Sequence, residues 1–107
     1  MIANEDFVDL SSTHTATKAK TLLRDCGNII NVAIVVMEPH GGGPNTPGLH
    51  RHDPMFIVVE GEIRAQIGGA TKVVKKDETI MVDGRLPHSI WNDGDTPAKV
   101  VKLSITR

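Results

Sequence analysis

Frequent turn signals between short apolar runs constrain this fold more than any other feature of the sequence. The run from Ile29 to Met37 consists mainly of Ile, Val and Ala and is bounded by turn residues on both sides, which predicts a buried strand. Glycine turns recur later at Gly68-Gly69 and Asp83-Gly84, and no stretch carries a convincing helical pattern. We therefore predict an all-β chain of about eight to ten short strands that form an antiparallel barrel or sandwich.

The segment from residue 38 to residue 48 interrupts this pattern. It contains four glycines and three prolines, which remove hydrogen-bond donors and conformational preference. The sequence predicts an irregular loop here that leads the chain to His50. A surface crossover and a flap at the mouth of a site are both compatible with this composition.

Length and composition indicate one small domain. The chain has 107 residues, and its core must be built from aliphatic side chains because it has two Phe, one Trp and no Tyr. Residues 1–16 are polar and predict an N-terminal arm, with His14 in solvent, while residues 17–107 form a single barrel domain. The single cysteine, Cys26, excludes an internal disulfide and argues against a cysteine-based zinc site.

Charge and hydropathy narrow the range of partners. The formal net charge of -1 offers no basic field for nucleic acid, so we expect no nucleic-acid partner. No apolar run is long enough to span a bilayer and the N-terminus lacks a signal-peptide pattern, so we expect no membrane partner and a cytoplasmic location. A small core with sheet edges favours a homodimer, through the arm or through an outer sheet face that carries Trp91.

Three histidines are the strongest chemical signal. In an extended chain His50 and His52 point to the same face, with Cα atoms about 6 to 7 Å apart. His88 begins another expected strand, and if the two strands lie close, three imidazoles converge. Three protein nitrogens with open positions are typical of a catalytic rather than a structural metal site. Further residues are expected to line or support the cavity: Met55, Phe56, Ile90 and Asn92.

At these residues the chain resembles the cupin superfamily. The first cupin motif places a His-x-His pair ahead of a glutamate and a glycine, and His50, His52 and Gly61 match it. The second motif ends in a glycine, a histidine and an asparagine, and Gly84, His88 and Asn92 match it with one extra residue before His88. The resemblance implies a double-stranded β-helix, or jelly-roll barrel, in which the three histidines bind a divalent metal.

The chain departs from the cupin motif where the glutamate ligand belongs. Only eight residues separate His52 from Gly61, and Pro54 occupies the glutamate position. Asp53 is the nearest carboxylate but faces away from His52 in an extended chain. The sequence therefore predicts a three-histidine site without a carboxylate, with Asp53 at the Pro54 bend or His40 from the glycine-rich segment as alternatives for a fourth ligand.

A neutral ligand set leaves the full charge on the metal and favours an anionic or chelating small molecule. Cupins with three histidines resemble thiol or diketone dioxygenases. We therefore expect a divalent transition metal, one of Fe, Mn, Ni, Cu or Zn, and a metal-dependent oxygenase of the dioxygenase type that acts on a small organic acid or chelating carbonyl compound. One alternative is a non-catalytic ligand-binding or sensing cupin. Another is an isomerase or lyase of carbohydrate-derived acids, which requires Arg64 or Gln66 to turn inward.

Overall fold

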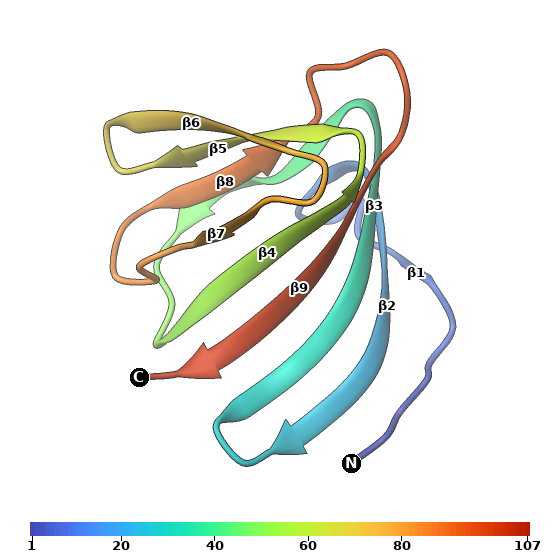
Figure 1. Ribbon diagram of the computed structural model, residues 1–107, viewed down its shortest axis with the longest axis vertical. Helices are drawn as coiled ribbons and strands as arrows, with labels where there is room; N and C mark the ends of the chain where they lie inside the picture. Colours follow the sequence, from blue (N-terminus) through green and yellow to red (C-terminus); the bar gives the residue numbers. More distant parts are fainter.

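The computed structural model of the protein describes residues 1–47 and 49–107, and in this part of the chain all regular structure is β-strand. The strands fold into a jelly-roll barrel, as the sequence predicts (Figure 1). Their bounds are β1 Val8–Asp9, β2 Thr15–Cys26, β3 Ile29–Gly48, β4 His52–Glu60, β5 Glu62–Ile67, β6 Ala70–Lys75, β7 Thr79–Met81, β8 His88–Trp91 and β9 Ala98–Thr106.

One long strand, β3, connects the two halves of the barrel. Its first part pairs with β2 on one side and β9 on the other, and its later part pairs with β8. The strands follow the order β6-β5-β8-β3-β9-β4-β7, and β2 lies beside β3 with β1 at its outer edge. Figure 1 shows β5, β6 and β8 facing the sheet of β2, β3, β9 and β4. The space between these two layers holds the core.

The core follows from strand alternation. Val58 of β4, Ile63 of β5 and Val100 of β9 are each at most 1% exposed and point between the layers. Burying each of these side chains contributes about 1.5–3 kcal/mol. Pro54 is also fully buried, on the same face of β4 as Val58. The sequence position that cupins use for a glutamate is therefore part of the packed interior in this chain.

The glycine-rich segment is not the irregular loop that the sequence predicts. It continues β3, and Gly42 and Gly43 pair with Trp91 and Ile90 of β8. Gly42 has a φ of +142°, and a Cβ atom there would overlap the carbonyl oxygen of Ile90. The glycines therefore allow one backbone to approach another closely, which composition alone does not distinguish from flexibility.

The N-terminal residues pack onto the barrel. Strand β1 pairs with Ala19 and Lys18 of β2, and the backbone N–H of His14 donates to Leu10 in a tight turn. The division of the chain at residue 16 stays a prediction. Within the described residues, no helix has the length and apolar character needed to cross a membrane.

Candidate functional site

His50, His52 and His88 lie side by side where the start of β4 meets the start of β8. The ring centroids of His50 and His52 are 5.0 Å apart, and those of His50 and His88 are 4.7 Å apart. Backbone contacts position the pair, because the N–H of His50 donates to the carbonyl of Gly84 at 2.7 Å and His52 pairs with Thr106 of β9. The fold thus gathers three imidazoles from two segments distant in sequence.

The three rings do not have the geometry of a metal-coordination site. The His50 and His52 planes meet at 82°, edge to face, and those of His50 and His88 at 44°. Across residues 1–47 and 49–107, no set of three or more His, Cys, Asp or Glu side chains has a metal-holding arrangement. The three rings as they stand therefore do not form a metal-binding arrangement.

The chemistry of the donor set nevertheless fits a divalent transition metal, because imidazole nitrogens are its common protein ligands. His88 Nδ1 lies 2.9 Å from the carbonyl oxygen of Leu86, which only accepts, so Nδ1 carries the proton. The Nε2 lone pair of His88 is then free. A backbone carbonyl that holds the other ring nitrogen is a typical supporting contact of a metal-binding histidine.

Burial and neighbouring positive charge favour neutral imidazoles. Burial lowers the pKa of His50, and the adjacent His88 and His52 lower it further. Burial also lowers the pKa of His52, with Lys102 as the next cause. Both histidines therefore lose their protons more readily than in water. The neutral ring is the form that donates a lone pair to a metal.

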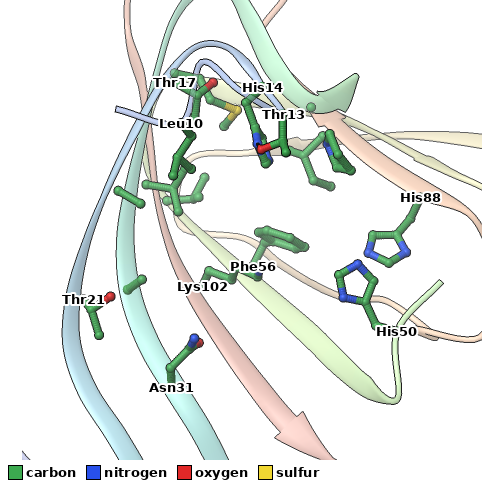
Figure 2. Close-up of a pocket in the computed structure, with 18 of the residues that line it drawn as sticks. Leu10, Thr13, His14, Thr17, Thr21, Asn31, His50, Phe56, His88 and Lys102 are labelled. Atoms are coloured by element: carbon green, nitrogen blue, oxygen red, sulfur yellow. Dashed lines mark hydrogen bonds between the residues drawn. The ribbon is translucent and has the colours of Figure 1, made fainter. Parts of the chain in front are cut away.

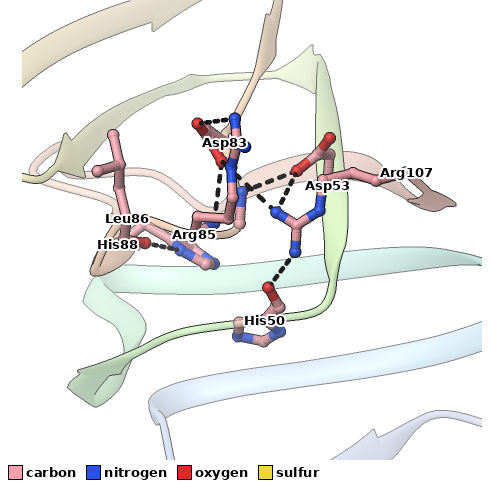
Figure 3. A network of polar contacts seen from close by, with 8 residues as sticks. His50, Asp53, Asp83, Arg85, Leu86, His88 and Arg107 are labelled. Carbon is pink, nitrogen blue, oxygen red and sulfur yellow. Dashed lines mark hydrogen bonds and ion pairs between the residues drawn. The ribbon is translucent and has the colours of Figure 1, made fainter.

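The two alternatives for a fourth ligand, Asp53 and His40, make contacts outside the histidine cluster. Asp53 Oδ1 accepts from the backbone N–H of Gly84 at 2.9 Å and lies 3.5 Å from Arg107 Nη1, in the polar network of Figure 3. His40 is exposed and its backbone N–H donates to the carbonyl of Asn92. Asp53 therefore links the start of β4 to the turn before β8, and its Oδ1 already accepts a hydrogen bond there.

A pocket of about 450 Å³ opens beside the histidines (Figure 2). His50, His88, Phe56 and Ile90 line it, together with residues of β2, β3, β9 and the turn before β2. His52 is not among the lining residues. The pocket wall is largely apolar, so it suits a small organic molecule with few polar groups.

Met55 and Asn92, which were expected to line or support the cavity, are not among its lining residues. Met55 faces the opposite side of β4 from Phe56, beside Met81 and Leu103, because side chains alternate along a strand. Asn92 is buried, and its Nδ2 donates to the carbonyls of Met37 at 3.0 Å and Thr96 at 2.8 Å. Asn92 thus supports the end of β8 from within the fold.

The sequence did not predict several of the pocket residues, among them His14 and Lys102. His14 is not in solvent but lines the pocket, with Nδ1 2.7 Å from the hydroxyl of Thr13. Lys102 of β9 also lines it. Alternation from the buried Ala98 and Val100 was the available signal for Lys102, whereas nothing in the N-terminal sequence indicated where His14 would lie.

Comparison with known proteins supports the fold and leaves the activity open. A search of the curated proteins finds no significant match. A predicted oxalate decarboxylase from Thermotoga maritima has a similar structure, with a TM-score of 0.82, 14% identity, and coverage of 100% of this chain and 99% of that one. The Cupin_2 domain of an XRE family transcriptional regulator from Enterobacter cloacae also has a similar structure, with a TM-score of 0.76, 18% identity, and coverage of 86% of this chain and 98% of that one.

The polyketide cyclase RemF from Streptomyces resistomycificus is a third similar structure, with a TM-score of 0.73, 17% identity, and coverage of 89% of this chain and 68% of that one. At such identities these similarities show the fold alone, and one fold hosts many functions. The sequence itself matches the cupin domain family over residues 33–106, which is more than half of the chain. This chain therefore belongs to the cupin family.

Proposed function

We propose that this cupin binds a divalent transition metal through His50, His52 and His88 and uses it to act on a small organic acid or chelating carbonyl compound. The observation that carries the proposal is the cluster of three imidazoles, with ring centroids 5.0 and 4.7 Å apart, of which His50 and His88 line the pocket. Fe, Mn, Ni, Cu and Zn all accept imidazole ligands, so the identity of the metal is a matter for measurement.

The residues of the chain have separable roles in this proposal. Nδ1 of His88 is held by the carbonyl of Leu86, and burial lowers the pKa of His50, which favours its neutral, ligating form. Phe56 and Ile90 exclude water from the apolar part of the pocket. When bound, a metal with neutral ligands supplies Lewis acidity or a site for both substrate and dioxygen. An oxygenase is the reaction class that agrees best with three histidines and no carboxylate.

Elemental analysis of the purified protein and of single variants tests the metal site. We expect a transition metal at near one equivalent in the unaltered protein, and a large loss of that metal in His50→Ala, His52→Ala and His88→Ala. His40→Ala is the matched control, because His40 is exposed and lies outside the cluster. Equal metal content in all four variants would contradict the site. An empty or zinc-filled protein would count against the oxygenase.

A non-catalytic ligand-binding or sensing cupin is the second candidate. One observation favours it: among the described residues that line the pocket, none is an Asp or a Glu, so His14 and Lys102 are the acid-base groups there besides the proposed metal ligands. Oxygen consumption on a panel of organic acids and diketones separates the two candidates. Ligand binding without turnover in the metal-loaded protein would favour the sensor.

The isomerase or lyase alternative required Arg64 or Gln66 to point into the pocket, and neither does. Gln66 is exposed, and Arg64 is held by Asp93 at 2.7 Å and by Gln66 at 2.9 Å. Neither side chain lines the pocket. A cytoplasmic location and a homodimer stay predictions, and a small-molecule ligand is the partner that the pocket suits.

A further inference from the structure

Lys102 occupies an unusual place for a lysine. It lies in the middle of β9, between Ala33 of β3 and Phe56 of β4, on the same face as the buried Val100. That face points between the two layers of the barrel. Figure 2 shows Lys102 beside Phe56 in the same pocket as His50 and His88.

No acidic group of the described chain neutralises this lysine. The ion pairs of residues 1–47 and 49–107 join other side chains, and no Asp or Glu lines the pocket. Burial lowers the pKa of Lys102, and no carboxylate counteracts this effect. An ammonium group that is partly removed from water and has no anionic partner is costly, and an anionic ligand in the pocket would offset that cost.

A second polar group in the pocket also lacks a partner. Asn31 of β3 lines the pocket, and its Oδ1 is buried without a hydrogen bond. Asn31 lies opposite Ser104, whereas Ala33 lies opposite Lys102, so Asn31 and Lys102 are diagonal neighbours on one sheet face. Such neighbours are about 7–8 Å apart, a span that one small ligand can bridge.

We propose that Lys102 and Asn31 form an anchor for a carboxylate ligand, with the ammonium group binding the carboxylate and Asn31 Oδ1 accepting from a hydroxyl group next to it. Phe56 and the neighbouring aliphatic wall then receive the apolar body of the ligand. The class of molecule is a small α-hydroxy acid or a related carboxylic acid with an apolar substituent.

This inference deepens the proposed function because it concerns the same pocket, and it narrows the substrate class to acids. It does not require the metal, since Lys102 and Asn31 are not among the proposed ligands. Metal-free protein prepared with a chelator can therefore test it separately. Loss of metal binding and loss of acid binding are then independent results.

Calorimetric titration with three related probes, phenylacetate, phenylacetamide and mandelate, tests the anchor. Phenylacetamide removes the charge, and mandelate adds the α-hydroxyl group. We expect the unaltered protein to bind phenylacetate at least about 10-fold more tightly than phenylacetamide, and mandelate more tightly than phenylacetate. Lys102→Met should lower the affinity for phenylacetate by about 10- to 100-fold and leave the affinity for phenylacetamide unchanged.

Matched variants separate the anchor from general effects on the fold. Lys99→Met removes a lysine from the same strand that points to the other face, so it should leave all three affinities unchanged. Asn31→Ala should abolish only the advantage of mandelate over phenylacetate. Equal affinity for acid and amide in the unaltered protein, or unchanged acid binding in Lys102→Met, would overturn the inference. Failure of all three probes to bind at millimolar concentration would also overturn it.

Discussion

Gly84 lies against the backbone of the strand that carries His52, and Gly84→Ala tests how the site is positioned. A Cβ atom at Gly84 would overlap the carbonyl oxygen of His52 and lie 3.3 Å from the Cβ atom of His50. The same glycine accepts from the N–H of His50 at 2.7 Å and donates to Asp53 Oδ1 at 2.9 Å. One added methyl group therefore disturbs both hydrogen bonds that join Gly84 to the His50–Asp53 segment.

The cost of this substitution follows from three effects. Forcing a methyl group against backbone costs about 1–3 kcal/mol. The two hydrogen bonds that the shift weakens contribute about 0.5–1.5 kcal/mol each. Alanine offsets about 0.4–1 kcal/mol of this destabilisation, because it has fewer backbone conformations than glycine in the unfolded chain. Central values give a net loss of about 3 kcal/mol in the free energy of unfolding.

Urea unfolding at one protein concentration measures the loss. With a slope of about 2 kcal/mol per M, the midpoint should fall by about 1.5 M. Gly69→Ala is the control, because a Cβ atom at Gly69 meets nothing within 4 Å, and its midpoint should stay close to that of the unaltered protein. Equal midpoints for the two variants would refute the close approach of Gly84 to His52. If the proposed metal site is correct, Gly84→Ala also loses metal.

Two further predictions concern pH and assembly. Burial lowers the pKa of His50 and His52 in the folded protein below 6.5, so the unfolded chain binds protons at higher pH than the folded one. The stability of the metal-free protein should therefore fall as pH drops below 6.5. Urea midpoints measured across pH should show this fall, and a double His50→Gln, His52→Gln variant should show less of it. The sequence predicts a homodimer through the N-terminal arm or the face that carries Trp91, whereas the structure exposes Ile57 and Met81 on the outward face of β4 and β7, and we expect a second copy of the chain to cover that face instead. Ile57→Lys should therefore give the sedimentation mass of a monomer while Val73→Lys, on β6, does not, and a monomeric unaltered protein would contradict the dimer.

Much of the fold was predictable because it rests on local patterns. Alternating and β-branched runs determined the strands around Ile29–Met37 and Glu62–Ile67, and glycine turns marked their ends. The glycine-rich segment was the exception. Its glycines permit pairing of β3 with β8, and a local pattern cannot show that a distant backbone lies against Gly42.

The candidate site was predictable in its histidines but not in its surroundings. The spacing of His50 and His52 predicts a shared strand face, whereas the structure places His50 just before β4, with a bend at Arg51. His88 was predicted from its place at the start of a strand and from the cupin resemblance. The hydrogen bond that occupies Asp53 joins it to Gly84, which is 31 residues away. Such a contact depends on how β4 meets the turn before β8.

The sequence by itself determined an all-β barrel and the places of His52 and His88 at strand starts, because strand period and turn chemistry are properties of neighbouring residues. Only the tertiary structure decided that Lys102 and Asn31 face the same pocket as His50. Those residues come from β9, β3 and the start of β4, and the register between strands distant in sequence brings them together. Register depends on the packing of the whole core, so no single segment encodes it.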